Sequence, residues 1–176
     1  RVVAFEILLV ASVLILYFAD DWFNTVSGEN AYGIFGGTDI NLTGTMTVSG
    51  TKNAYGFSGI NGKLAIGKDA KLNVTAAENG NVVAIGATNL TMDEFLYTLD
   101  YKSTGTGNVY VISASTANLS NISGSINATA EGTGNAVGIG FNSGTLDNFT
   151  GEINVVSGGS GYGISGSYGT RNITNS

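Results

Sequence analysis

One five-residue string recurs six times along this chain of 176 residues, and no other feature constrains the fold as strongly. Each copy begins with Asn or Ser, has Tyr or Val at its third place and ends in Ile or Phe. The copies start 23, 28, 27, 27 and 25 residues apart. A recurrence of this length is typical of proteins built from stacked repeats. The copies are Asn30–Ile34, Asn53–Phe57, Asn81–Ile85, Asn108–Ile112, Asn135–Ile139 and Ser160–Ile164.

A second pattern recurs between the copies, most clearly in Leu119–Ala128 and Leu146–Val155. Apolar and polar residues alternate there, which is the period of a strand with one buried face. The 27 glycines and the many Thr, Asn and Val residues exclude a helix. We therefore predict a β-rich repeat domain over residues 25–176, with about three short strands in each repeat. A parallel β-helix of about six coils fits the period, and a β-sandwich is the alternative.

The five-residue string also predicts which residues face the interior. Its second and fourth places hold mostly Ala or Gly, whereas its third and fifth places are bulky. We expect the bulky places to point inward and the small places to form a flat outer face suited to lateral contact. An aromatic platform for sugar rings is the alternative for the third place. That column is Tyr32, Tyr55, Val83, Tyr110, Val137 and Tyr162.

Composition excludes most catalytic devices and one class of partner. The chain has no Cys and no His, which removes thiolate nucleophiles, imidazole acids or bases and ordinary zinc sites. The formal net charge is −6 and the seven cations are scattered, so nucleic acid is not an expected partner. Asp93 and Glu94 would point to opposite faces of a strand, so we predict no paired-carboxylate site. The segment 92–102 is expected to be a solvated loop or a bulge, and we predict no enzyme activity, metal or cofactor.

The first 24 residues form a separate hydrophobic segment. Residues 2–19 contain one acid, Glu6, and as a helix would span about 27 Å, close to the thickness of a bilayer core. A cleaved signal peptide fits poorly, because Tyr17 and Phe18 precede the small residue Ala19. A plain membrane anchor fits the length but leaves Glu6 without a partner. We predict an N-terminal hydrophobic α-helix over residues 1–24.

The run from Val2 to Leu9 resembles the start of type IV pilins and of archaeal proteins with class III signals. Those subunits carry a glutamate near the fifth mature position, and Glu6 is fifth if Val2 is the first mature residue. The resemblance implies that Glu6 pairs with the α-amino group of a neighbouring subunit while the helices pack as a filament core. It also implies a membrane-anchored stage before assembly. The assembly residues implied are Arg1, Val2, Phe5, Glu6, Leu9 and Leu16.

Eight Asn-x-Ser/Thr sequons occur, whereas 19 Asn and 35 Ser or Thr predict about four by chance. Asn73 and Asn127 each lie between two apolar strand residues, so we expect their side chains to point outward and to be glycosylated. Asn41, Asn121 and Asn148 precede an apolar residue and a turn, where Asn commonly bonds to backbone. Heavy glycosylation would favour an archaeal source. The remaining sequons are at Asn89, Asn118 and Asn172.

The strings over residues 30–170 resemble passenger regions of autotransporter-type adhesins. Our leading hypothesis is a structural subunit of an extracellular, pilus-like filament that polymerises with itself through residues 1–24 and exposes a glycosylated β-domain for adhesion. The alternative is a membrane-tethered or secreted β-helix adhesin that recognises surface or host glycans. An enzyme acting on polysaccharide ranks third, because no cluster of acids lines one strand face.

Overall fold

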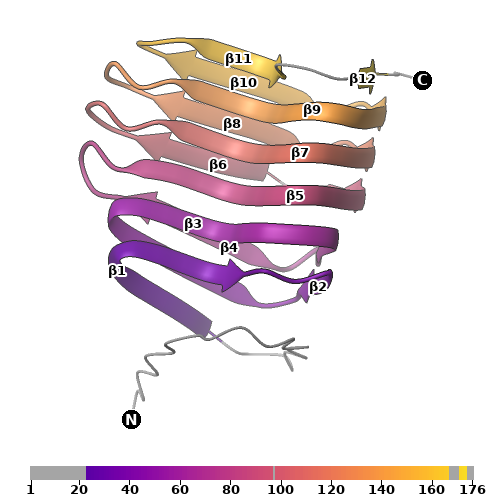
Figure 1. The fold of residues 1–176 in the computed structure, drawn as a ribbon, viewed down its shortest axis with the longest axis horizontal. Coiled ribbons are helices and arrows are strands. Elements are labelled where there is room, and N and C mark those ends of the chain that lie inside the picture. Colours follow the sequence, from indigo (N-terminus) through magenta and orange to yellow (C-terminus); the bar gives the residue numbers. More distant parts are fainter. Residues whose placement is uncertain (1–22, 97, 167–170, 174–176) are drawn as a thin grey trace.

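The computed structural model describes residues 23–96, 98–166 and 171–173. These ranges are mainly β and form a parallel β-solenoid of about 5 turns (Figure 1). The predicted parallel β-helix is thus confirmed with about five turns instead of six, and the β-sandwich is wrong because neighbouring strands pair in parallel. The strands are β1 (Phe23–Phe35), β2 (Asp39–Leu42), β3 (Thr45–Ile66), β4 (Lys71–Ala76), β5 (Asn81–Phe95), β6 (Thr98–Ser103), β7 (Val109–Ile122), β8 (Ser125–Ala130), β9 (Ala136–Phe149), β10 (Glu152–Ser157), β11 (Gly161–Ser165) and β12 (Arg171–Ile173).

Consecutive coils stack with the repeated strings in register. Tyr32 pairs with Tyr55, Tyr55 with Val83, and Val83 with Tyr110. The strings lie on the path β1-β3-β5-β7-β9-β11 of the larger sheet. Because one coil equals one sequence period, equivalent side chains form columns along the solenoid axis, about 4.8 Å apart.

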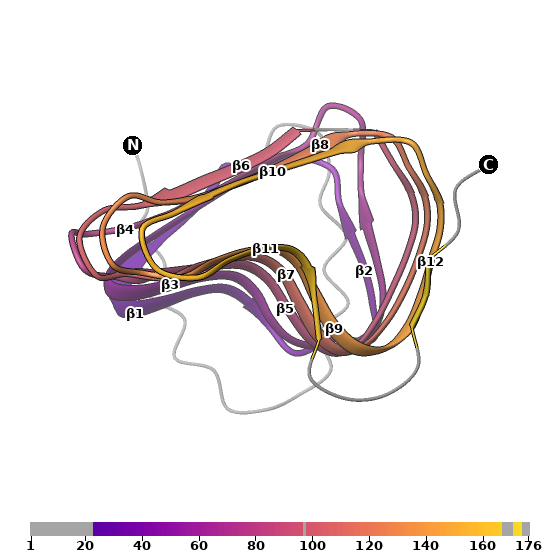
Figure 2. The ribbon, with the colours of Figure 1, turned by 90° about the horizontal axis from the view of Figure 1, so that it is seen from above.

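Each coil has three straight parts, as the view along the axis shows (Figure 2). The first part contains β4, β6, β8 and β10. The second part is the five-residue string, and the third is the end of β5, β7 or β9, with β2 and β12 paired on this side. The first and second parts lie close together and enclose a narrow lobe, whereas the third part closes a wider one.

The narrow lobe explains the small residues of the string. A Cβ added to Gly33 would lie 2.7 Å from the Sδ of Met46, and one added to Gly56 would lie 2.9 Å from a Val74 methyl group. The second and fourth places therefore face the interior, where Ala54 and its equivalents are buried. The prediction that these places form a flat outer face for lateral contact is wrong, because bulky side chains do not fit between the two facing walls.

A corner in the coil breaks the alternation of the strand. Ala84 and Ile85 are consecutive and both are fully buried, and Val111 and Ile112 repeat this arrangement in the next coil. Two consecutive buried residues indicate a bend in the strand, and β5, β7 and β9 bend between the narrow and the wide lobe (Figure 2). The predicted inward position of the fifth place is confirmed by Ile85, Ile112 and their equivalents. The third place is exposed or half-buried at all four tyrosines and at Val83, and only Val137 of this column is buried. The predicted core ladder of tyrosines is therefore wrong.

The first place of the string forms an asparagine ladder at the turn of each coil. The side-chain amide of Asn53 donates to Asn30 Oδ1 at 2.7 Å, and Asn81 donates to Asn53 Oδ1 at the same distance. Farther along, the backbone N–H of Asn135 donates to Asn108 Oδ1 at 2.8 Å. These bonds satisfy polar groups at the turns, and they give the recurring Asn a structural reason that depends on the stacking of the coils.

The segment 92–102, predicted to be a solvated loop or a bulge, lies mostly in strands β5 and β6, with a left-handed kink at Glu94. Glu94 has a φ of 66°, and Asn121 and Asn148 have φ values of 54° and 50° just before the ends of β7 and β9. In β5 and β7 one residue on each strand, Glu94 and Asn121, lies between the paired residues Asp93–Ser120 and Phe95–Ile122, so the register is kept and both strands kink together. Left-handed backbone is accessible to Asn at little cost, which accounts for two of the three residues.

Tyr101 connects two parts of the first wall that share no backbone ladder. The sheet β10-β8-β6 ends at β6, whereas β4 belongs to the other sheet. The hydroxyl of buried Tyr101 donates to the carbonyl oxygen of Leu72 in β4 at 2.9 Å. Burial raises the pKa of Tyr101 far above its ordinary value. The phenol therefore remains a neutral donor across this discontinuity.

The predicted N-terminal helix lies outside the described residues, except that residues 23 and 24 already belong to β1. Within the described ranges, the fold has no helix with the length and apolar character that crossing a membrane requires.

Candidate functional site

The outward third-place column is the most distinctive surface of the solenoid, and we call it the tyrosine face. Tyr32 and Tyr162 are 40% and 48% exposed, and Tyr55 and Tyr110 are half-buried. These exposures overturn the expected core ladder and support the alternative of an aromatic platform. The tyrosine face consists of Tyr32, Tyr55, Val83, Tyr110, Val137 and Tyr162.

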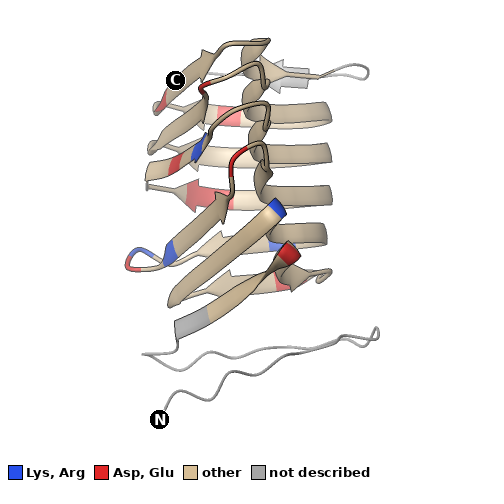
Figure 3. Ribbon diagram, turned by 90° about the vertical axis from the view of Figure 1, so that its left-hand side faces the viewer, with Lys and Arg blue, Asp and Glu red and all other residues tan. Residues whose placement is uncertain are grey.

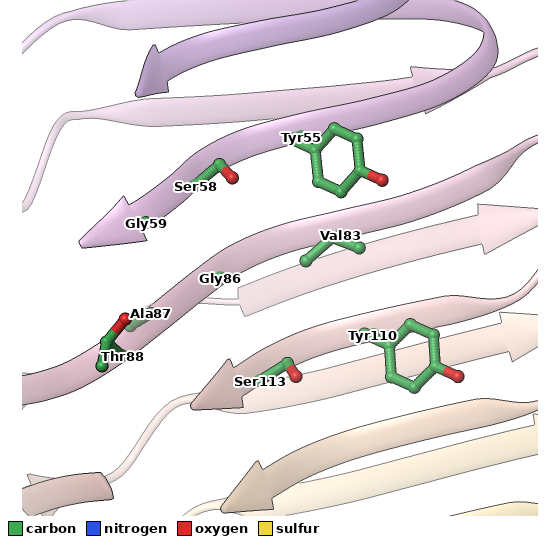
Figure 4. A pocket seen from close by; sticks show the side chains of 9 residues that line it. All are labelled: Tyr55, Ser58, Gly59, Val83, Gly86, Ala87, Thr88, Tyr110 and Ser113. Atoms are coloured by element: carbon green, nitrogen blue, oxygen red, sulfur yellow. The ribbon is translucent and has the colours of Figure 1, made fainter. Parts of the chain in front are cut away.

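A shallow depression of about 390 Å³ lies in the middle of this face. Figure 4 shows Tyr55 and Tyr110 on either side of Val83, with both hydroxyls pointing the same way and the rings broadside to the viewer. The bend of the coil produces the depression, because the strand beyond the string turns toward the side on which the tyrosines project and meets the string at a concave angle (Figure 2). The lining is Tyr55, Ser58, Gly59, Val83, Gly86, Ala87, Thr88, Tyr110 and Ser113.

Aromatic rings also bound the end of the tyrosine face nearest the N-terminus. The rings of Tyr32 and Tyr55 are stacked, with centroids 4.7 Å apart and an interplanar angle of 4°. Phe35 meets Tyr32 edge to face, with centroids 5.7 Å apart. Phe35 is 67% exposed. An exposed aromatic cluster of this kind is typical of a binding surface, because its burial by a ligand is favourable.

The depression is uncharged. All nine described lining residues are Tyr, Ser, Thr, Val, Ala or Gly. Burial raises the pKa of Tyr55, and the neighbouring Tyr32 raises it further, so the hydroxyl stays protonated at neutral pH. Charged residues are scattered over the side of the solenoid drawn in Figure 3. The exposed ion pairs Lys52–Glu29 and Lys102–Glu131 join adjacent coils. The lining therefore offers ring faces and neutral hydroxyl groups.

Most of the sequons face solvent. Asn73 is exposed, and Asn127 lies between buried Ile126 and Ala128, so the expected outward direction is confirmed for both. Asn127 Oδ1 accepts a 3.0 Å bond from Asn154. Asn73 makes a long bond of 3.4 Å to Thr47.

The turn sequons differ among themselves. The amide of Asn148 donates to Asn121 Oδ1 at 2.8 Å, and that of Asn121 donates to Asp93 at 3.0 Å. These two amides are engaged as expected, but with side chains of the previous coil and not with turn backbone. Asn41 lies within β2, paired with Ala65, so it does not share the left-handed position of the other two.

The remaining sequons lie along the third part of the coil. Asn89 donates to Asn61 Oδ1 at 2.5 Å, and Asn118 Oδ1 accepts from Thr145 at 3.3 Å. Asn172 pairs through its backbone with Thr145. The implied assembly residues Arg1, Val2, Phe5, Glu6, Leu9 and Leu16 lie outside the described residues.

The described part of the chain shows no cluster of three or more Asp or Glu side chains that could hold a metal ion. Asp93 is engaged with Ser120 Oγ at 2.7 Å as well as with Asn121, and these bonds lower its pKa. The tyrosine face and its depression are thus the strongest candidate for a functional surface.

Comparisons with known protein families, with characterised proteins and with solved structures give no match.

Proposed function

We propose that this solenoid is the carbohydrate-binding head of an adhesin displayed at the cell surface. The observation that carries the proposal is the outward column of tyrosines on the concave side of a corner. A tyrosine ring at such a position adds little to the core, yet the residue recurs in four of the six strings.

The lining matches the chemistry of sugars. A pyranose ring has an apolar face of C–H groups that packs on an aromatic face, and its hydroxyls need partners around the rim. Tyr55 and Tyr110 supply rings, while Ser58, Thr88 and Ser113 supply hydroxyls close by. Mostly apolar walls with a few polar groups are usual for sites that bind small molecules.

Removal of one ring tests the proposal. We expect Tyr110→Ala to weaken binding to an immobilised polysaccharide by about tenfold, which corresponds to the loss of one stacking contact. Asn127→Ala is the matched control, because Asn127 faces outward on β8, away from the tyrosine face. A panel of plant, microbial and host glycans identifies the polysaccharide first. If the panel gives no binding, or if both variants bind alike, the proposal is wrong.

A second candidate function rests on the sequence of the N-terminal segment. We propose that residues 1–24 assemble the subunits into an extracellular filament whose surface carries the solenoids. A carboxylate within an apolar run requires a cation or a proton, and Arg1 is the nearest cationic side chain in the sequence. Glu6→Ala should therefore leave the solenoid folded but stop filament formation in native material, whereas Ser12→Ala should not. Normal filaments from Glu6→Ala subunits would remove this candidate.

We further propose that the outward sequons carry glycans. A transferase must reach the Asn side chain and leave a bulky sugar in solvent, which Asn73 and Asn127 permit. The amide nitrogens of Asn121 and Asn148 donate to neighbouring coils at 3.0 and 2.8 Å. That of Asn73 makes a longer bond of 3.4 Å, and Asn127 is bonded through its Oδ1. The mass of the native protein, measured by mass spectrometry, should exceed 18.0 kDa by whole glycan units, with Asn73 and Asn127 among the modified sites. An unmodified mass contradicts both this proposal and an archaeal source.

A further inference from the structure

The tyrosine face repeats every second coil. From Tyr55 to Tyr162 the register alternates ring, valine, ring, valine, ring. Stacked coils lie about 4.8 Å apart, so successive rings lie about 10 Å apart and the three rings cover about 19 Å. The site therefore has equally spaced aromatic positions along the axis and not one isolated pocket.

Small residues keep the space beside the rings open along the same direction. Ser58 and Gly86 line the depression, and Gly86 pairs with Ser113, which pairs with Gly140. Gly140 in turn pairs with Ser165 in β11. Figure 2 shows β3, β5, β7, β9 and β11 overlying one another through the same bend. The hollow beside the tyrosines thus continues beyond the depression as one track parallel to the axis, which we call the axial track.

Phe35 ends the axial track on the side nearest the N-terminus. It pairs with Ser58 and so occupies the place that Ser or Gly holds in the later coils. Its ring meets Tyr32 edge to face. A chain lying along the track would therefore meet an aromatic barrier beyond Tyr55.

We infer that the axial track binds a single uncharged, extended polysaccharide chain parallel to the solenoid axis, with sugar rings stacked on Tyr55, Tyr110 and Tyr162. This inference rests on the proposed carbohydrate-binding function and adds the class and direction of the ligand. An extended, β-linked chain turns over at each residue, so every second ring presents the same face. The two-coil repeat of the tyrosines matches a ligand with a two-residue repeat.

Charge selects among polysaccharides. Acidic glycans are usually held by Arg or Lys, and the lining described above contains neither. The chain as a whole has a net charge of −6, which repels a polyanion further. An uncharged chain has no charge to desolvate on entering this surface, and Ser and Thr at the edge can replace the hydrogen bonds that its hydroxyls lose to water.

Oligosaccharides of increasing length test the direction of binding. We propose calorimetric titration of the whole chain with β-1,4-linked glucose, mannose and xylose oligomers, from the disaccharide to the octasaccharide, and with galacturonate oligomers of equal length. Affinity for one neutral series should rise with length until the oligomer spans two platforms, because the second contact forms within the complex. Tyr110→Ala should weaken binding at every length, and Tyr162→Ala should weaken only that of the longer oligomers.

A blocked track provides an independent measurement. Ser113→Phe places a ring like that of Phe35 in the middle of the axial track. We expect this variant to abolish the increase in affinity with oligosaccharide length. Thr129→Phe is the control, because Thr129 occupies an outward position on β8, on the opposite wall. Equal denaturation midpoints for the two variants show that the fold is retained.

The outcomes separate the two proposals. Binding that does not change with length, or Tyr162→Ala losses that are equal at all lengths, would show that the site takes a terminal sugar; the carbohydrate function would stand and the axial inference would fail. Tighter binding of galacturonate oligomers also overturns the inference. If no carbohydrate binds and sedimentation shows a dimer that Ser113→Phe disrupts, the face is an interface between copies and both proposals fail.

Discussion

Two glycines of β9 test which way each place of the repeated string faces. Gly138 and Gly140 lie two residues apart, so the simple alternation of a strand puts them on the same face. The corner between Gly138 and Ile139 instead leaves Gly138 in the narrow lobe and Gly140 on the outer face beside Val137. We expect Gly138→Ala to have a lower free energy of unfolding than Gly140→Ala.

The magnitude follows from the contacts that each new methyl group would make. At Gly138 it would lie 2.5 Å from a methyl group of Ile153 and 2.9 Å from the carbonyl oxygen of Gly163. Either the facing wall or the backbone of the adjacent strand must therefore move. Overpacking of this kind costs about 1–3 kcal/mol. At Gly140 the nearest atom is a methyl group of Val137 at 3.3 Å, on the open side of the sheet.

Replacing glycine by alanine also stabilises both variants through the backbone of the unfolded chain. Neither glycine has a positive φ, so Ala restricts the unfolded chain and stabilises by about 0.4–1 kcal/mol at either position. This contribution cancels when the two variants are compared. Gly140→Ala should be neutral or slightly stabilising, and Gly138→Ala should be less stable than Gly140→Ala by about 1–3 kcal/mol.

Urea denaturation followed by far-ultraviolet circular dichroism measures this difference. The midpoints should separate while the slopes remain equal, because the same surface is exposed on unfolding. Equal midpoints, or a lower midpoint for Gly140→Ala, would refute the corner and restore simple alternation.

Three further predictions concern the core, the gap between β4 and β6 in the first wall, and the dependence of stability on pH. Ile112→Ala should lower the free energy of unfolding by about 2–5 kcal/mol in denaturation experiments, whereas Tyr110→Ala should lower it by about 1 kcal/mol. Similar losses for the two variants would contradict an outward Tyr110. Tyr101→Phe should cost about 1–3 kcal/mol, because it leaves the Leu72 carbonyl without this donor; an unchanged midpoint would contradict that role. The lowered pKa of Asp93 means that its contribution to stability is present above its unfolded pKa of about 3.9 and is lost as the pH falls through the folded value. Midpoints measured between neutral pH and pH about 2 should therefore fall less for Asp93→Asn than for the unchanged chain; parallel profiles would exclude this effect.

The outward direction of Asn73 and Asn127 could be predicted from sequence because their strands are straight and alternate without interruption. Asn121 and Asn148 could be recognised as turn-type positions, yet their hydrogen bonds run to other coils and depend on stacking. The asparagine ladder carried a visible signal, since the first place of the string is Asn in five of six copies. Its meaning depends on the 23- to 28-residue spacing that brings successive copies together in space.

The sequence by itself determined the strand content, the parallel stacking and the length of one coil, because a repeated period and alternating residues are local properties of the chain. Only the tertiary structure decided which side of the string is buried. Local size suggested that tyrosine lies inside and glycine outside, but the opposite wall stands too close to Gly33 and Gly56 for larger side chains. That distance is set by Met46, Val74 and other residues elsewhere in the coil. The tyrosines therefore face solvent, and the binding surface exists because the interior has no room for them.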